Sequence, residues 1–261
     1  MDDHSGGAAT ARHGTIAFAT LYGIVCHLTY IASAVVMIWV MYTGMSAALG
    51  RVPAPWAWFA NIGLLLQFPL IHSALLSKRG SAFMGRLIPG TLGKPLLTTT
   101  YVLIASIQQG VIFLFWTPTG PVLWQAHGVV LVVMTIGYTA AWLLLAKSIV
   151  DAGFAAQVGL LGWRAVVRGK PPVYPPMPRS GLFAWCRQPI YASFVLATLT
   201  VPTITPDSLA MTLVLGGYCL IGPLIKEARW SRRYGAQFTA YQARVPYWFP
   251  RWPARRGERT G

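Results

Sequence analysis

Charged side chains are scarce in this 261-residue chain, with 21 Lys and Arg and only 6 Asp and Glu, or 10% of the residues. Soluble domains carry about 25% charged residues. Because 55% of the residues are hydrophobic, a soluble fold would lack the polar side chains that its surface requires. The same hydrophobicity excludes an intrinsically disordered chain. The composition therefore predicts an integral membrane protein.

Residue patterns of several common site types are also missing. The three cysteines, Cys26, Cys186 and Cys219, lie far apart without CxxC spacing, which excludes a disulfide framework and a zinc knuckle. The sequence has no HExxH, no GxxxxGK[ST] and no GxGxxG after a strand, so zinc-protease, P-loop and dinucleotide sites lack support. The five histidines are too scattered for a metal site.

Long uncharged segments are what the sequence has instead. A helix needs about 20 apolar residues to cross a bilayer. The segments predict six spans, at about 16–42, 54–76, 96–116, 122–146, 184–203 and 208–226. Only residues 204–207 separate the last two, which predicts a helical hairpin. The expected fold is an all-α polytopic membrane helix bundle, one domain over 1–261, with four spans in 16–146 and a loop, the hairpin and a tail in 147–261.

The basic residues predict the orientation of this bundle. With six spans, twenty of the 21 Lys and Arg fall on the side of both termini, leaving only Arg51 opposite. Basic loops stay in the cytoplasm, so both termini are expected there, in a bacterial inner membrane. The net charge of +15 thus lies beside anionic headgroups, each basic residue gaining about 1 kcal/mol. We expect the bilayer as partner, no nucleic acid and no obligatory protein partner.

Two polar segments outside the predicted spans stand out. The loop after the fourth span opens with an expected amphipathic helix over 151–168 and continues in a proline-rich segment, 169–178, that cannot be helical. The C-terminal tail keeps helical character to about Arg244 and stops at Pro246. Any site exposed to the cytoplasm is expected near these segments.

The first motif, Arg187-Gln188-Pro189-x-Tyr191, enters the fifth span. Pro189 suits the first turn of a helix, where a missing N–H costs nothing. Arg187 and Tyr191 then lie at the membrane boundary. An arginine extending to the headgroups and an interfacial tyrosine would explain both without any function.

The second motif begins with Glu227, one of six acids, at the end of the sixth span. A carboxylate at that depth needs a partner or a ligand. Trp230 and Ser231 occupy its i+3 and i+4 positions, so a partner must come from elsewhere, for instance Arg187 across the hairpin. A structural ion pair and a ligand contact remain alternatives.

Together these motifs resemble the isoprenylcysteine carboxyl methyltransferase-like superfamily of membrane methyltransferases. Arg187-Gln188-Pro189-x-Tyr191 is similar to the family's Arg-His-Pro-x-Tyr, and Glu227 is followed in the family's order by Gly235, Phe238-x-x-Tyr241 and Val245-Pro246-x-x-x-Pro250. Gln188 in place of His, and Lys226 in place of a second Glu, depart from the pattern. The resemblance implies S-adenosyl-L-methionine as cofactor, with these contacts: Gln188, Pro189, Tyr191, Glu227 and Tyr241.

The N-terminal half resembles a narrower group. Gln67, His72 and Ser73 at the end of the second span, and Tyr101 in the third, are similar to segments of bacterial methanethiol S-methyltransferases and the related NnrU-domain proteins. This implies methyl transfer to a small thiol, with methanethiol converted to dimethyl sulfide. Carboxyl methylation of isoprenylcysteine and a non-catalytic NnrU-like protein of nitrogen-oxide metabolism are the alternatives. A transporter would need a polar path across the spans, and none is evident.

Methyl transfer to sulfur requires a thiolate, so a nearby cation or base assists it. Arg187 is expected to supply the positive charge, and either His72 or Tyr101 to accept the proton. The predicted topology puts these three side chains, with Tyr191 and Glu227, at one membrane depth. That shared depth favours a single active site.

Overall fold

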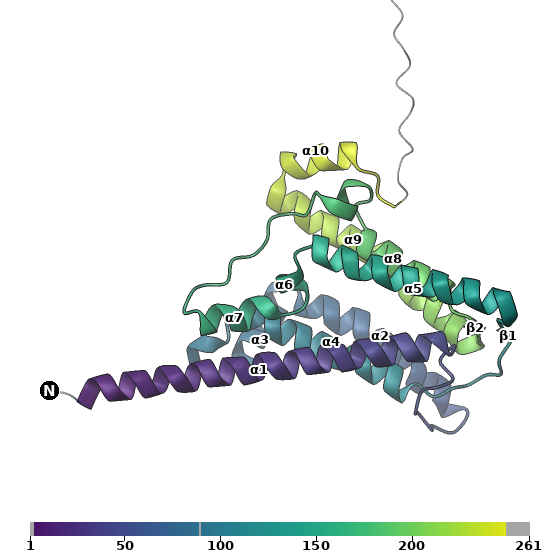
Figure 1. Cartoon of the computed structure of the whole chain (residues 1–261), viewed down its shortest axis with the longest axis horizontal. Helices are drawn as coiled ribbons and strands as arrows, with labels where there is room; N and C mark the ends of the chain where they lie inside the picture. The colour runs from purple at the N-terminus through teal and green to yellow at the C-terminus, as the bar shows by residue number, and fades with distance from the viewer. Residues whose placement is uncertain (1–2, 89, 249–261) are drawn as a thin grey trace, which may run out of the picture.

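The computed structural model describes residues 3–88 and 90–248, and the secondary structure of this part is almost entirely helical (Figure 1). Phe249 and Pro250, which end the second motif, and the basic residues after them lie outside the described residues. The long helices are α1 (Asp3–Tyr42), α2 (Trp56–Leu75), α4 (Leu97–Phe115), α5 (Gly128–Asp151), α8 (Pro189–Leu199) and α9 (Pro206–Tyr234). The short ones are α3 (Lys78–Leu87), α6 (Phe154–Gln157), α7 (Leu160–Val167), α10 (Ala236–Arg244), η1 (Gly90–Leu92) and η2 (Gly181–Ala184). Two short strands, β1 (Trp124–Gln125) and β2 (Thr203–Ile204), pair antiparallel, with Trp124 opposite Ile204.

Five helices are long and apolar enough to cross a membrane, namely Arg12–Tyr42 within α1, α2, α4, α5 and α9. Many of their large apolar side chains face outward, as expected for contact with lipid tails; Leu28, Phe59, Val133 and Leu213 are examples. The prediction of an all-α integral membrane protein is confirmed.

The fifth predicted span, 184–203, was too long. Its helix α8 has only 11 residues, which rise about 16 Å, short of the roughly 30 Å hydrocarbon core. Pro189 occupies its first turn, and Pro202 follows its end before the chain becomes extended in β2. The chain still passes between the two ends of the bundle here, because α8 runs beside α5 and α9 (Figure 1).

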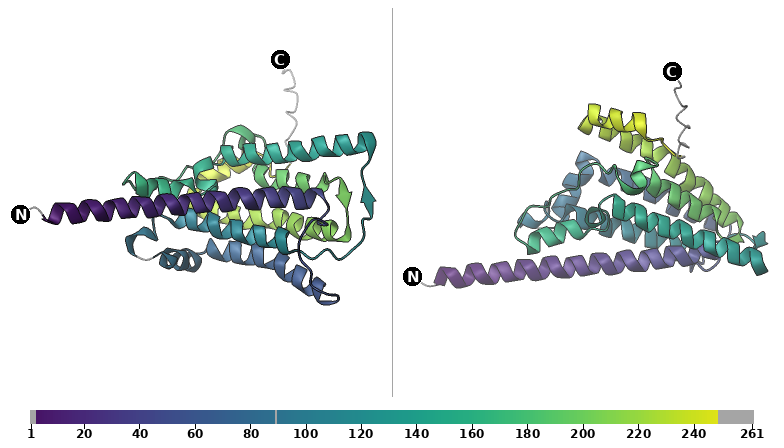
Figure 2. Two further views of the ribbon diagram at one scale, coloured as in Figure 1. Left: turned by 60° about the horizontal axis from the view of Figure 1, so that its bottom comes forward. Right: turned by 45° about the horizontal axis from the view of Figure 1, so that its top comes forward.

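The long helices form two groups that converge at one end and diverge at the other (Figure 2). α1, α2 and α4 pack together, and α5, α8 and α9 form the second group. Where the groups converge, near β1 and β2, buried side chains of both form one core that includes Met41, Phe113, Trp116, Tyr138 and Met211. We call this the β end.

Polar contacts hold the connecting segments at the β end. The side-chain amide of Asn61 makes two hydrogen bonds with the backbone of Thr117. It donates one to the Thr117 carbonyl at 2.8 Å and accepts one from the Thr117 N–H at 3.0 Å. Buried Asp207 accepts from the N–H and the hydroxyl of Thr119. Arg51 binds the carbonyls of Ala48 and Gly50 nearby. The buried polar groups Asn61, Thr117 and Asp207 are therefore all paired at this end of the bundle.

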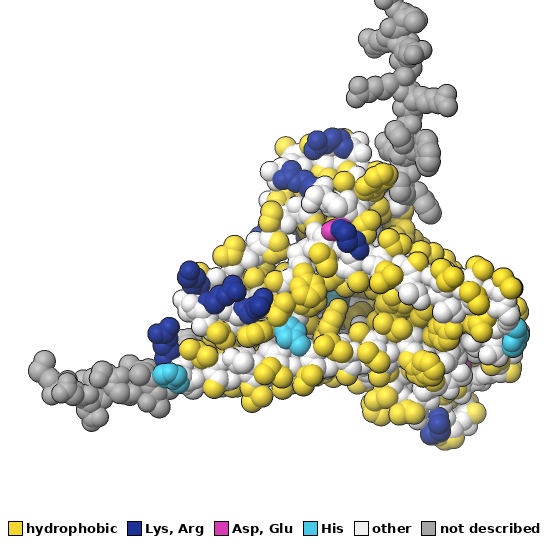
Figure 3. Space-filling model, viewed as in Figure 1, with side chains coloured by type: hydrophobic (Ala, Val, Ile, Leu, Met, Phe, Trp, Pro, Cys, Tyr) yellow, Lys and Arg dark blue, Asp and Glu magenta, His cyan; other side chains and the backbone are white. Residues whose placement is uncertain are grey.

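At the opposite end, which we call the basic end, Lys and Arg side chains gather over α7, the end of α9 and α10 (Figure 3). The expected helix over 151–168 is broken here into α6 and α7, because Gly153 and Gly159 adopt positive φ. The proline-rich segment is extended, as predicted. The tail forms α10, which ends at Arg244 as predicted, after a turn at Gly235 with φ of +49°.

Candidate active site

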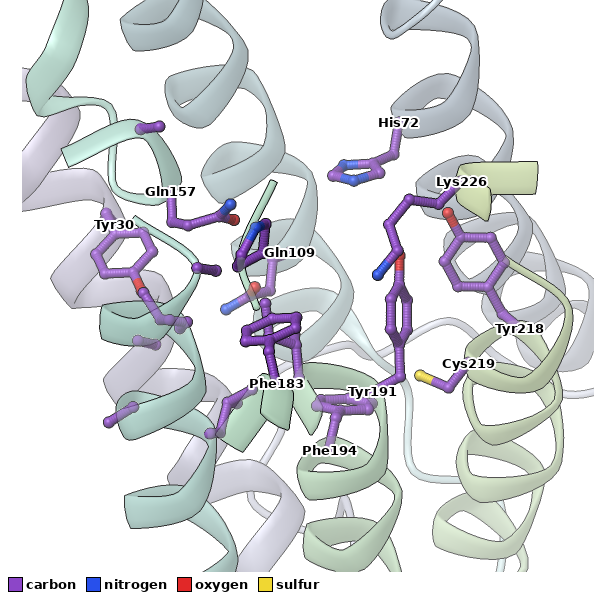
Figure 4. A pocket seen from close by; sticks show the side chains of 18 of the residues that line it. Tyr30, His72, Gln109, Gln157, Phe183, Tyr191, Phe194, Tyr218, Cys219 and Lys226 are labelled. Carbon is purple, nitrogen blue, oxygen red and sulfur yellow. The ribbon is translucent and has the colours of Figure 1, made fainter. Parts of the chain in front are cut away.

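A cavity of about 710 Å³ lies between the two helix groups, on the side of the basic end. This volume is within the range of sites that hold small molecules and cofactors. Side chains from α1, α2, α4, α5, α8 and α9 line it, and residues 174–178 of the proline-rich segment border it. Figure 3 shows the hollow between the two groups, and Figure 4 shows the side chains around it.

His72 of α2 lines this cavity and pairs with Tyr101 of α4. The Tyr101 hydroxyl and His72 Nε2 are 2.6 Å apart. Phe68 stacks on the imidazole with ring centres 4.9 Å apart, which fixes the ring plane. Nδ1 of His72 is buried and has no hydrogen-bond partner in the described part of the chain. A buried ring nitrogen without a partner is costly, so it fits a site that a ligand completes.

Lys226 of α9 also lines the cavity, on the same side as His72 in Figure 4. Nζ lies 5.1 Å from the ring centre of Tyr191 and 5.0 Å from that of Trp230. These are cation–π distances. Its one hydrogen bond among the described residues goes to Oε1 of Gln188, at 2.5 Å. A cation held between two rings therefore faces the cavity.

Gln188 connects this lysine to Glu227. Its Nε2 donates to Oε1 of Glu227 at 2.6 Å, while its Oε1 accepts from Lys226. A carboxylate only accepts hydrogen bonds and an ammonium only donates them, so the amide fits in one orientation alone. Gln188 is 1% exposed and keeps the two charges apart.

Arg187 and Glu227 form the ion pair that was one of the two alternatives. Arg187 Nε is 2.9 Å from Oε1 of Glu227, and Nη2 is 3.3 Å from Oε2. Nη1 of Arg187 donates to the carbonyls of Gln242 and Val245, and the Gln242 amide donates to Glu227 as well. Neither charged residue is among those that line the cavity. The pair lies behind the wall and fastens the end of α10 and the following Val245 to the start of α8.

Tyr241 also acts behind the wall. Its side chain is buried against Phe238, Val245 and Met177, and its hydroxyl donates to the carbonyl of Phe183 at 2.7 Å. Burial raises the pKa of Tyr241 above its usual range, so the hydroxyl stays protonated as this donor. Phe183 itself lines the cavity. α10 thus supports the wall through η2.

The structure brings the predicted site residues into two layers. His72, Tyr191 and the unpredicted Lys226 contribute to the cavity wall, and Tyr101 is bound to His72. Pro189 begins α8 as predicted, and the remaining predicted residues lie behind the wall: Arg187, Gln188, Glu227 and Tyr241. Sequence reasoning missed Lys226 as a wall residue, as well as Tyr218 and Arg233. A signal existed, since positions 219, 226, 230 and 233 are spaced to lie on one helix face.

The chain is similar over most of its length to proteins named methanethiol S-methyltransferase. It is 24% identical over 249 residues to the one from Crocosphaera subtropica, covering 89% of this chain and 92% of that protein. With the one from Mycobacterium tuberculosis the identity is 27% over 202 residues, covering 75% and 78%. With nurim of Sus scrofa it is 27% over 173 residues, covering 63% of each chain.

No family model matches the chain, and no solved structure matches it. The relatives confirm the predicted resemblance to methanethiol S-methyltransferases, and their names support methyl transfer as the reaction class.

Proposed function

We propose that this protein is an S-adenosyl-L-methionine-dependent methyltransferase that methylates a small thiol, with methanethiol as substrate and dimethyl sulfide as product. The observation that carries the proposal is His72 in the wall of the cavity, hydrogen-bonded to Tyr101, in a chain similar to proteins of that name. The pair offers a proton acceptor where the two helix groups diverge.

The cavity wall fits the groups of this cofactor. Arg233, at the basic end of the cavity, suits a carboxylate, and the amides of Gln109 and Gln157 suit the hydrogen-bonding edge of an adenine. Aromatic faces such as Trp142 and Phe194 suit a sulfonium. When bound, the cofactor supplies an electrophilic methyl group. Arg187, Gln188, Glu227 and Tyr241 would then support the cofactor's surroundings from behind the wall.

His72 and Tyr101 would work as one unit on the substrate proton. The 2.6 Å contact of the Tyr101 hydroxyl with Nε2 would orient the imidazole and leave Nδ1 as the ring nitrogen that can take up the substrate proton. The stacked Phe68 holds the imidazole in place, and the apolar helices exclude water from it. Holding reactants in a fixed, dry geometry is the largest contribution that such a site offers to a displacement.

The substrate would enter from the bilayer between α1 and α5. Ala146 of α5 is exposed and also lines the cavity, and Ala34 and Tyr30 of α1 line the same side. The cavity is therefore open towards the lipid through small side chains. A small uncharged thiol partitions into the bilayer and reaches this opening without crossing the polar tail.

The test uses purified protein in detergent or membranes that contain it, supplied with S-adenosylmethionine and methanethiol. We expect dimethyl sulfide in the gas phase above the sample, and binding of the radiolabelled cofactor to the protein. Formation of a methyl ester from a prenylated cysteine, without dimethyl sulfide, would assign carboxyl methylation instead. Absence of cofactor binding would identify a non-catalytic protein.

A further inference from the structure

Among the described residues, Lys226 forms no direct ion pair with a carboxylate. In the described part of the chain the ion pairs are Lys147–Asp151 and Arg187–Glu227, and neither includes Lys226. The neighbouring Glu227 is occupied, because Arg187, Gln188 and Gln242 all donate to its two oxygens. Lys226 has only one amide oxygen and two aromatic faces around it.

The rest of the cavity lining does not supply a counter-charge either. The described lining residues include Lys226 and Arg233 but no Asp or Glu. Around Lys226 the wall is formed by Tyr191, Tyr218 and Cys219 (Figure 4), and by Trp230, whose ring lies beside the ammonium group. In such surroundings water screens charge poorly, so an anion beside the ammonium is stabilised much more than in bulk water.

We propose that the Lys226 ammonium is the anion-binding group of this cavity and that it binds the sulfur of the thiol substrate as a thiolate. The inference rests on the proposed function and identifies the residue that ionises the substrate. Sequence reasoning gave this role to Arg187, but the structure turns Arg187 towards Glu227 and the backbone of the tail.

The position of Lys226 favours a thiolate over the carboxylate of the cofactor. Arg233 also lines the cavity, seven residues and about 10 Å further along α9 towards the basic end. A fully hydrated carboxylate is best held there, beside the polar tail. Lys226 lies deeper, with its ammonium group over the ring of Tyr191, where an uncharged thiol from the bilayer would arrive.

The ionisation step has a simple balance. The S–H bond breaks, its electron pair stays on sulfur beside the Lys226 ammonium, and the proton passes to the unpartnered ring nitrogen of His72 or to water. No electron is gained or lost. His72 and Lys226 line the same cavity, so one can take the proton while the other stabilises the anion.

The experiment follows the S–H stretching band of methanethiol by infrared difference spectroscopy, using cofactor-free purified protein over a range of pH. Lys226→Met removes the charge at similar volume, and Lys226→Arg keeps it. Lys78→Met, on the exposed face of α3, is the matched control for loss of one lysine. Size-exclusion profiles and thermal unfolding establish that each variant is folded, with Lys226→Gln as a second neutral variant.

We expect bound methanethiol to ionise at least one pH unit below the free thiol in the wild-type protein, in Lys226→Arg and in Lys78→Met. In Lys226→Met this shift should be lost. At a pH below the pKa of the free thiol, the fraction of bound methanethiol present as thiolate should then fall tenfold or more. An unchanged titration in Lys226→Met would overturn the proposal. If that variant instead lost more than tenfold in S-adenosylmethionine affinity, the ammonium would hold the cofactor carboxylate.

The failure of the proposed function would look different. The wild-type protein would then release no dimethyl sulfide, whereas the infrared titration, which needs no cofactor, would still report whether Lys226 binds a thiolate.

Discussion

At the scale of single residues, the carboxylate of Glu227 is the best-satisfied polar group near the cavity. Its two oxygens accept from Arg187, Gln188 and Gln242, and its side chain is 10% exposed. Arg187 in turn binds the backbone at the end of α10 and at Val245 after it. One carboxylate thus links α8, α9 and the tail.

Replacing Glu227 by Gln should destabilise this junction by on the order of 3 kcal/mol, because Arg187 would be left in a mostly buried place without its counter-charge. The N–H groups of the new amide would also face the N–H groups that Gln188 and Gln242 now donate to Glu227. Denaturant unfolding in detergent and limited proteolysis of the tail measure the effect. Arg187→Lys keeps the charge but loses the two-pronged contact with the carboxylate. The stability of this variant should lie between those of the wild type and Glu227→Gln. Equal stability of all three proteins would contradict this role.

His72→Ala should slow dimethyl sulfide release about 100-fold, within the range of lost acid–base catalysis. The rising limb of the pH–rate profile should move to higher pH, because the thiol must then ionise without an acceptor. Tyr101→Phe should have a smaller effect in the same direction. The control is His27→Gln, since His27 pairs with Trp163 outside the cavity lining. An unshifted pH profile in His72→Ala would remove His72 as the base.

At the scale of elements, α1 and α5 meet at one end and separate at the other. The Tyr42 hydroxyl is 2.9 Å from that of Thr135, and the Tyr138 hydroxyl donates to the carbonyl of Ile38 at 2.6 Å. Beyond these contacts the helices diverge, and small side chains such as Ala34 and Ala146 line the opening. The divergence of two helices, rather than a loop, therefore makes the lateral opening.

A large side chain in this opening should hinder entry of the thiol but not binding of the cofactor. In Ala146→Trp we expect the KM for methanethiol to rise about tenfold, while binding of S-adenosylmethionine stays unchanged, since the large ring blocks the gap between the helices. Ala140→Trp adds the same ring to an exposed position of α5 outside the cavity lining and should behave like wild type. Equal KM values for the two variants would place substrate entry elsewhere.

At the scale of the whole molecule, charge and apolar surface are separated along the bundle. Lys and Arg gather at the basic end, while Arg51 lies at the β end (Figure 3). The surface between them is largely apolar. Such an asymmetry orients a protein with its basic end in the cytoplasm.

A reporter fused after Gly261 should accordingly read cytoplasmic, and one inserted between Val52 and Pro53 should read external. This insertion point is exposed at the β end, whereas Asp207, in the other connection there, is buried and paired with Thr119. Alkaline phosphatase and fluorescent-protein fusions measure the two locations. An external C-terminus would overturn the orientation and, with it, access of the cofactor to the basic end.

The sequence by itself determined the membrane helices, because a long uncharged apolar run is a local property that requires a helix wherever it meets lipid. α2 and α4 therefore lie within about a residue or two of the predicted spans, whereas α5, at Gly128–Asp151, lies several residues after the predicted span 122–146. The resemblance to known membrane methyltransferases, rather than local pattern, singled out His72, Tyr101 and the motifs around Arg187 and Glu227. Local pattern overestimated the length of α8. The ends of this helix are set by Pro189 and by the pairing of β2 with β1, which is a contact between residues about 80 positions apart.

Only the tertiary structure decided which of these polar residues face the cavity. Lys226 and Glu227 are adjacent in the sequence, yet neighbours on a helix point about 100° apart. One therefore enters the cavity wall, and the other turns to Arg187. Which direction faces a cavity depends on where two helix groups diverge, and that divergence is set by the packing of side chains distant in sequence, such as Met41, Phe113 and Met211 at the β end.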